Sequence, residues 1–187
     1  MKLVILDRDG VINQDSDEYI KTPAEWLPIP GSLQAIASLK TAGWTVAIAT
    51  NQSGLARGLF DTRALDAIHQ TMHCALAKYE AEIDFLVWCP HGPYDQCECR
   101  KPKPGLYHHI AAHFCCSLYN VPVIGDSKRD LDAAVAVGAQ PILVQTGKGL
   151  RAITAGQLPA ATQTYADLQA AVTALLAENN RLSIKVS

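Results

Sequence analysis

Short apolar runs alternate with longer segments of mixed polarity along the 187-residue chain. The runs are rich in Val, Ile and Leu, each ends in polar residues, and they cover residues 3–6, 46–49, 85–88, 122–124 and 141–144. Continuous apolar runs of this length are typical of strands buried on both faces, as in a parallel sheet that helices cover on each side.

The segments between these runs carry apolar residues at intervals of three and four, over residues 32–41, 62–81, 105–117, 129–137 and 165–177. This spacing predicts helices, and Gly43, Gly138 and the Asp61-Thr62 pair provide matching stop and start signals. Strands that alternate with helices predict an α/β fold with a doubly wound, mostly parallel sheet. We expect one domain over residues 1–179 and a frayed tail over residues 180–187.

Composition narrows the function classes. The chain has 16 Lys and Arg against 18 Asp and Glu, a formal charge of −2, so it lacks the basic excess of a nucleic-acid binder. The apolar run before Asp7 is too short for a signal peptide, and no stretch is long and apolar enough to span a membrane. We therefore expect a cytoplasmic protein without nucleic-acid or membrane partners, and few exposed apolar runs favour a monomer.

Carboxylates follow two of the predicted strands, at the edge where ligands bind in sheets of this type. Asp7 and Asp9 leave the first strand on the same side, and Asp126 and Asp130 follow the fourth. Close carboxylates repel one another unless a cation lies between them, and Mg²⁺ prefers such oxygen ligands. An Asp-x-Asp pair alone is more often a charged turn after a strand, but a third acidic group, Asp126, at the same edge favours a metal site.

Two further segments supply groups that suit a phosphate. The Thr-Asn-Gln-Ser-Gly stretch at residues 50–54 offers uncharged donors, although such residues are also ordinary in loops. Residues 100–105 form a cationic segment stiffened by two prolines. It could be a solvated basic loop, but opposite three carboxylates it supplies the positive charge that a phosphoryl group requires.

These segments resemble, in order, the four motifs of the haloacid dehalogenase superfamily of phosphohydrolases. The matching residues are Asp7-Arg8-Asp9-Gly10-Val11-Ile12, Thr50-Asn51, Lys101-Pro102-Lys103-Pro104 and Gly125-Asp126-Ser127-Lys128-Arg129-Asp130. The ordered set spans residues 1 to about 150 and is highly specific.

The resemblance implies a role for each matching residue. Asp7 would be the nucleophile that forms an aspartyl phosphate, and Asp9 the general acid and then the general base. Asp7, the backbone carbonyl of Asp9 and Asp126 would bind the catalytic Mg²⁺, while Thr50 and Lys101 would hold the phosphate. Asp130 would take a secondary place, in contact with Lys128 or a metal-bound water.

Three cysteines and a histidine gather within eleven residues: Cys89, His91, Cys97 and Cys99. Cys₃His is a common structural zinc set, and the polar loop between these residues cannot pack a core. The alternative is two unrelated thiol pairs, and C-x-H with C-x-C is a less usual spacing than C-x-x-C. Zinc bound to this loop, residues 89–99, would fix Arg100 and Lys101, which directly follow it.

The remaining cysteines and histidines lie in helical segments. We expect Cys74, Cys115 and Cys116 to be core residues, and we assign no catalytic role to His69, His73, His108, His109 and His113.

The resemblance extends to one subgroup of the superfamily. The Asn-Gln-Ser-Gly-Leu-Ala-Arg-Gly stretch at residues 51–58 is similar to that of the phosphatases that act on D-glycero-D-manno-heptose 1,7-bisphosphate. It implies removal of the 7-phosphate in bacterial ADP-heptose and lipopolysaccharide core biosynthesis. Histidinol-phosphate phosphatases share the zinc loop and are one alternative. A zinc-stabilised binding module without turnover is another.

A bisphosphate substrate requires a second anion site, for which Arg57, Arg100 and Lys128 are candidates, since cationic side chains bind phosphate. Each could instead be a surface charge. Asn51 and Ser53 are further candidates for substrate contact. The loops between motifs leave no room for a large cap domain, so we expect an open site.

Overall fold

The computed structural model describes residues 1–184 and contains one six-stranded sheet. Its strands are β1 (Leu3–Leu6), β2 (Thr45–Asn51), β3 (Phe85–Cys89), β4 (Pro122–Gly125), β5 (Gln140–Val144) and β6 (Gln163–Tyr165). They lie in the order β3-β2-β1-β4-β5-β6, and each neighbouring pair is parallel. The predicted doubly wound parallel sheet is confirmed.

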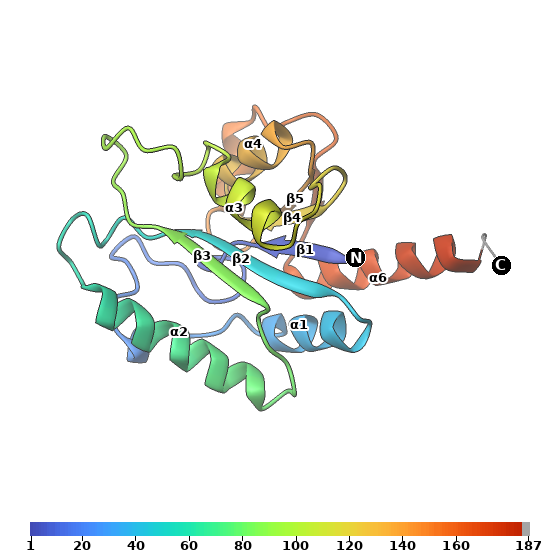
Figure 1. Ribbon diagram of the computed structural model, residues 1–187, viewed down its shortest axis with the longest axis horizontal. Coiled ribbons are helices and arrows are strands. Elements are labelled where there is room, and N and C mark those ends of the chain that lie inside the picture. Colours follow the sequence, from blue (N-terminus) through green and yellow to red (C-terminus); the bar gives the residue numbers. More distant parts are fainter. Residues whose placement is uncertain (185–187) are drawn as a thin grey trace.

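Helices cover both faces of the sheet (Figure 1). They are α1 (Ser32–Thr41), α2 (Thr62–Ala77), α3 (Gly105–His113), α4 (Lys128–Ala136), α5 (Gly149–Ala155) and α6 (Leu168–Ile184), with a short 3₁₀ helix η1 (Pro23–Glu25). Helices α1, α2 and α6 pack on one face, where Val4, Leu6 and Ile48 point. Helices α3 and α4 cover the other face, against Ile5 and Ala47. Alternate residues of each central strand therefore enter two separate cores, as expected for strands buried on both sides.

Several element boundaries differ from the predicted ones. Helices α2 and α3 end four residues early, because Glu80 and Cys115 adopt positive φ angles of 53° and 50° that a helix cannot accommodate. Strand β6 and helix α5 were not predicted, since they have only three and seven residues and no continuous apolar run.

Helix α6 continues to Ile184, beyond the predicted start of the tail at residue 180. No Gly or Pro interrupts residues 168–184, so nothing in the sequence ends the helix earlier. Residues 185–187 of the predicted tail lie outside the described part of the chain.

Two of the three cysteines outside the 89–99 loop are not core residues, contrary to the prediction. Cys74 and Cys115 are exposed, whereas Cys116 is partly buried and packs against the core beneath α3 and α4. Cys74 lies two positions after the buried Met72 on α2, and a shift of two residues turns a side chain away from the buried face.

The strand order reverses at β1, which lies between β2 and β4. Ligand sites in such sheets lie beyond the carboxyl ends of the strands at this point. In residues 1–184, loops occupy this edge, and no large cap covers it. Among these residues no helix has the length and apolar content that a membrane crossing requires.

Candidate active site

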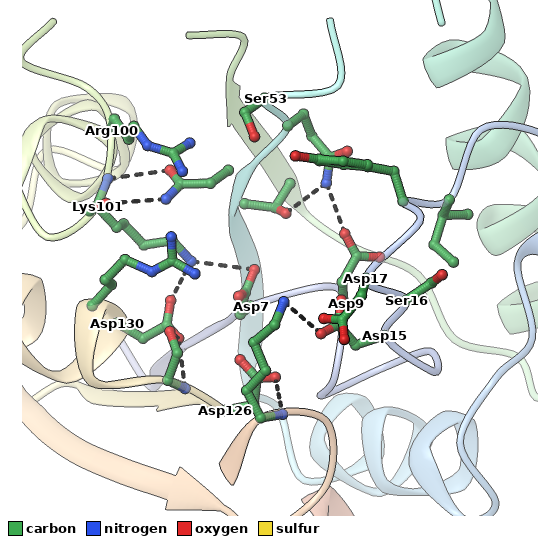
Figure 2. Close-up of a pocket in the computed structure, with 18 of the residues that line it drawn as sticks. Asp7, Asp9, Asp15, Ser16, Asp17, Ser53, Arg100, Lys101, Asp126 and Asp130 are labelled. Carbon is green, nitrogen blue, oxygen red and sulfur yellow. Dashed lines mark hydrogen bonds and ion pairs between the residues drawn. The ribbon is translucent and has the colours of Figure 1, made fainter. Parts of the chain in front are cut away.

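A cavity of about 320 Å³ opens at the carboxyl edge of the sheet. Every predicted catalytic, magnesium-binding and substrate-contact residue lines it except Lys128; these are Asp7, Asp9, Thr50, Asn51, Ser53, Arg57, Arg100, Lys101 and Asp126. The side chains converge from β1, β2, β4 and the segment before α3 (Figure 2). The volume lies at the lower end of the range for small-molecule sites, about 300–1,000 Å³.

Lys101 forms the centre of the cavity floor and is only 2% exposed. Its ammonium Nζ lies 3.2 Å from Asp7 Oδ1 and 2.5 Å from Asp130 Oδ1, and it donates a hydrogen bond to the carbonyl oxygen of Ala49. Burial disfavours the charged ammonium, but the two carboxylates outweigh this effect and raise the pKa of Lys101. A permanently positive charge thus lies beside Asp7.

Asp130 holds Lys101 rather than Lys128, which corrects the sequence interpretation. Its second oxygen, Oδ2, accepts hydrogen bonds from the backbone N–H and the hydroxyl of Ser127, the residue that caps helix α4. Both oxygens are therefore occupied by the protein. Lys128 instead pairs with Asp132 one turn later on α4, with 2.6 Å between Nζ and Oδ2.

Asp7 and Asp126 are the carboxylates whose ionised forms are least favoured. Burial, opposed by Lys101 and reinforced by Asp130, raises the pKa of Asp7 to about 7. Burial together with the charges of Asp130 and Asp7 raises the pKa of Asp126 to about 8. A divalent cation between them would relieve this repulsion.

The donor set fits Mg²⁺. Carboxylate oxygens of Asp7, Asp126 and Asp130 lie within 4.8 Å of one another. Because Asp130 is committed to Lys101 and Ser127, Asp7 and Asp126 remain as the candidate ligands. Gly10, with a φ of 81°, lets the Asp126 carboxylate pack directly against the backbone after Asp9, since a Cβ at this position would overlap Asp126 Oδ2. The glycine therefore allows Asp126 to lie close to the first strand, as a shared ligand set requires.

Asp9 lies beside the floor and has several hydrogen-bond donors around it. Arg8 donates from Nε and NH2 to its two oxygens, Asn13 donates to Oδ1, and Gln52 donates to Oδ2. Burial alone would raise the pKa of Asp9, but the Arg8 charge and these donors outweigh it and hold the pKa below its usual range.

Residues at the end of β2 organise the wall of the cavity. The Asn51 side chain accepts a hydrogen bond from the Lys101 backbone N–H and donates one to the Lys101 carbonyl oxygen, both at 3.1 Å. Asn51 therefore fixes the segment that carries Lys101. Thr50 is buried, and its hydroxyl accepts a hydrogen bond from Gln52, which also contacts Asp9.

The rim of the cavity carries three guanidinium groups, from Arg57, Arg100 and Arg129. In residues 1–184 none of the three forms an ion pair with a carboxylate. Burial and the neighbouring charge of Arg129 lower the pKa of Arg100, so the two guanidiniums repel each other. Two unpaired cations this close favour an anion between them.

Sequence reasoning missed two parts of this rim. Arg129 follows Lys128 directly, and only the orientation of α4 decides which of the two faces the cavity. The loop 15–20 also lines it, and Lys148 holds this loop through a 2.7 Å ion pair with Asp15. The position of this loop soon after Asp9 is a usable signal for its place in the site.

A second cluster lies behind the rim. The side-chain ligand atoms of Cys89, His91, Cys97 and Cys99 come within 4.8 Å of one another. The Cys89 sulfur lies 3.7 Å from the Cys97 sulfur and 3.1 Å from the Cys99 sulfur, and three thiols with one imidazole are a common structural zinc set. The donor set therefore fits zinc. Arg100 donates a hydrogen bond to the His91 carbonyl oxygen, which ties the rim to this cluster.

Two family models match the chain. One, described as polynucleotide kinase 3 phosphatase, matches residues 2–127, and another, described as HAD-hydrolase-like, matches residues 98–171. Together they cover the strand ends and the loops that build the cavity.

Individual relatives match nearly the whole chain. The D-glycero-β-D-manno-heptose-1,7-bisphosphate 7-phosphatase of Bordetella bronchiseptica is 57% identical over 178 residues, which are 95% of this chain and 99% of the relative. The enzyme of the same name from Pseudomonas putida is 56% identical, over 91% of this chain and 97% of the relative.

Solved structures agree with these matches. The crystal structure of the B. bronchiseptica D,D-heptose 1,7-bisphosphate phosphatase complexed with magnesium and phosphate superposes with a TM-score of 0.94 at 57% identity, covering 95% of this chain and 99% of that one. The Burkholderia thailandensis phosphatase superposes with a TM-score of 0.76 at 44% identity, over 94% of this chain and 99% of that one. The chain therefore belongs to the D-glycero-β-D-manno-heptose-1,7-bisphosphate 7-phosphatase family of the haloacid dehalogenase superfamily.

Proposed function

We propose that this protein removes the phosphate from C7 of D-glycero-β-D-manno-heptose 1,7-bisphosphate in a Mg²⁺-dependent reaction. One observation carries the proposal: Asp7 faces a polar cavity with Lys101 at 3.2 Å and with Asp9 and Asp126 also in the lining. The names of the relatives and the magnesium and phosphate bound by the B. bronchiseptica enzyme support it.

The reaction divides into two transfers at Asp7. In the first, a carboxylate oxygen of Asp7 attacks phosphorus, the bond between phosphorus and the C7 oxygen breaks, and Asp9 donates a proton to that oxygen. Because Asp9 is ionised in the free enzyme, it must take up this proton when the anionic substrate binds beside it and raises its pKa. In the second, water attacks the aspartyl phosphate, Asp9 accepts a proton from the water, and the bond between Asp7 and phosphorus breaks. Inorganic phosphate leaves and both carboxyl groups return to their starting states.

Cations offset the charge of the transferred group. The Lys101 ammonium and the Thr50 hydroxyl lie where they can hold phosphate oxygens, while Asp130 keeps Lys101 in place. Asp7, Asp126 and the backbone carbonyl of Asp9 would hold Mg²⁺, which when bound offsets the repulsion between an anionic nucleophile and an anionic substrate. Asn51 acts on the phosphate through Lys101, whose backbone it fixes.

The rim provides a binding site for the second phosphate of the substrate. Arg57, Arg100 and Arg129 surround the cavity without carboxylate partners in residues 1–184, and guanidinium groups bind phosphate through two parallel hydrogen bonds. We assign the 1-phosphate to this rim and the 7-phosphate to the floor. Ser53, also in the lining, can donate a hydrogen bond to the sugar or to a phosphate.

A structural Zn²⁺ would be bound by Cys89, His91, Cys97 and Cys99, because four protein ligands leave no open position for chemistry.

We further propose that the enzyme is a cytoplasmic monomer with one catalytic domain over residues 1–179. A highly charged sugar bisphosphate does not cross a membrane unaided, so the enzyme must share a compartment with the reactions that make it. Its place would be ADP-heptose synthesis for the lipopolysaccharide core.

The test compares kcat/KM on heptose 1,7-bisphosphate and on histidinol phosphate, each with Mg²⁺. We expect at least about tenfold preference for the heptose. We also expect Asp7→Asn to lose turnover by about 10⁴-fold or more while the far-ultraviolet circular dichroism and the melting temperature persist. Asp132→Asn, the same change at the partner of Lys128, serves as the control and keeps full activity.

Each other outcome has a defined meaning. Preference for histidinol phosphate would overturn the substrate but not the reaction type. Turnover by Asp7→Asn at the normal rate would overturn the nucleophile. If neither substrate released phosphate, the reaction itself would be overturned, and the protein would be a binding module without turnover.

A further inference from the structure

Arg8 and His69 form a buried pair that the proposed reaction does not use. Arg8 follows the nucleophile at the end of β1 and is wholly buried, and His69 lies on the buried face of helix α2 with 8% exposure. Neither residue belongs to the cavity lining. A cation buried this completely requires partners, because an uncompensated charge in the interior is costly.

The partners of Arg8 are the Asp9 carboxylate and the His69 ring. Arg8 donates from Nε to Asp9 Oδ1 at 3.0 Å and from NH2 to Asp9 Oδ2 at 2.8 Å. Its third nitrogen, NH1, lies 3.2 Å from His69 Nε2. A guanidinium can only donate, so Nε2 of His69 must be the acceptor, and the ring must be neutral with its proton on Nδ1.

The protonation state of His69 agrees with this geometry. Burial, with the positive charge of Arg8, lowers the pKa of His69 to about 3. The ring is therefore a fixed acceptor at any working pH, and its side chain cannot itself exchange protons with the substrate. Its contribution must come through Arg8.

Arg8 is positioned to set the direction of the Asp9 carboxyl group. A bidentate pair restrains a carboxylate in two directions, whereas the single donors from Asn13 and Gln52 each restrain one oxygen. The orientation of the Asp9 carboxyl group thus depends on the plane of the Arg8 guanidinium. That plane depends in turn on His69 Nε2, which accepts from NH1 outside the cavity.

We propose that His69 is a positioning residue for Asp9, acting through Arg8, whose guanidinium it anchors in the plane that aims the Asp9 carboxyl group into the cavity. The inference rests on the proposed function, because it presumes that Asp9 exchanges the proton with the leaving group. It adds to the reaction a residue on α2 that belongs to none of the motifs.

The proposal predicts a defect that depends on the leaving group. Breaking the bond between phosphorus and the C7 oxygen produces a basic alkoxide, which needs the proton of Asp9 as it departs. The same step with 4-nitrophenyl phosphate releases a stable phenolate, which gains little from a proton donor. The ratio kcat/KM reports on the steps up to transfer to Asp7 and not on the later attack by water.

The experiment uses the whole enzyme with Mg²⁺ and compares His69→Leu with His69→Gln. Leucine removes the acceptor, whereas the Gln side-chain carbonyl oxygen can replace Nε2. We expect His69→Leu to lower kcat/KM on heptose 1,7-bisphosphate by about tenfold and to change the value on 4-nitrophenyl phosphate by less than about twofold. His69→Gln restores most of the heptose activity. His73→Leu, one turn later on α2 and partly exposed, is the matched control with normal activity.

Asp9→Asn tests the role of Asp9 separately from that of His69. It should show the same dependence on the leaving group, with a larger loss of kcat/KM. If Asp9→Asn affects both substrates equally, the role of Asp9 in the proposed function fails. If Asp9→Asn behaves as expected but His69→Leu lowers both substrates equally, or lowers neither, the positioning role is wrong. If His69→Leu does not fold, His69→Asn, too short to reach Arg8, replaces it, and equal activity of the Asn and Gln variants overturns the proposal.

Discussion

The floor and the rim of the cavity differ in how their charges are satisfied. The floor consists of Asp7, Asp9, Lys101, Asp126 and Asp130, and the rim of Arg57, Arg100 and Arg129. Each floor side chain has at least one hydrogen-bonding or ionic partner in the protein, as between Lys101 and Asp130. The rim guanidiniums have no carboxylate partner in residues 1–184.

This difference separates two kinds of task. A floor whose groups hold one another presents the same geometry to any phosphate, as chemistry requires. A rim of cations that lack carboxylate partners in residues 1–184 keeps its positive charge available to an anionic substrate. We infer that the floor determines the reaction and the rim determines which phosphorylated molecule undergoes it.

Zinc removal should have the largest effect, because floor and rim meet in the segment that follows the Cys89, His91, Cys97 and Cys99 cluster. We expect Cys97→Ser to lose bound zinc, lower the melting temperature and reduce kcat/KM by about 100-fold, the upper end for a disturbed metal shell. Both kcat and KM should change, since Arg100 loses its contact with the His91 carbonyl oxygen and Lys101 follows Arg100 directly in the chain. Metal analysis, calorimetry and steady-state kinetics measure these quantities.

Cys74→Ser provides the matched control, as the same substitution at an exposed thiol on α2. It should behave as the native protein does. If Cys97→Ser changed KM alone, the loop would support only the rim, and the shared segment would not couple the two regions.

The second largest effect should come from the floor, in the free energy of unfolding of the metal-free protein. The pKa values of Asp7 and Asp126 are raised, to about 7 and about 8, from about 3.9 in the unfolded chain. The folded state then binds more protons than the unfolded state between pH 4 and pH 8, so this contribution to the free energy of unfolding decreases as pH rises through that window. Asp126→Asn removes the cost and should be more stable than the native protein at pH 8 by about 2 kcal/mol.

Other groups titrate in the same window, so the informative quantity is the difference between Asp126→Asn and the native protein. His69 acts in the opposite direction: its lowered pKa of about 3 makes its contribution grow as pH rises towards 6.5. That contribution cancels in the difference. Saturating Mg²⁺ should reverse the order of stabilities, because only the native protein has both carboxylates. An equal pH dependence for both proteins would show that the floor carboxylates do not repel each other in this way.

Sequence patterns predicted the floor better than the rim, for a physical reason. Three floor residues follow buried strands, and parallel strands bring their carboxyl ends to one edge, so Asp7, Asp9 and Asp126 could be placed together from the sequence. The partner of Asp130 could not, because it depends on how the Lys101 segment crosses the sheet edge. His69 was left without a role, since a histidine on an apolar helix face gives no sign of what it contacts across the core.

The smallest effect should separate two neighbouring rim candidates, Lys128 and Arg129. Arg129 lines the cavity, whereas Lys128 pairs with Asp132 along the surface of α4. Arg129→Ala should raise KM for heptose 1,7-bisphosphate by about tenfold with kcat nearly unchanged, because a lost bidentate contact to the 1-phosphate weakens binding before and during the reaction alike. Lys128→Ala should change KM by less than twofold, as expected for an exposed ion pair. Heptose 7-phosphate, which lacks the second anion, should not distinguish Arg129→Ala from the native enzyme; if it does, Arg129 acts on the floor and the division of the cavity is wrong.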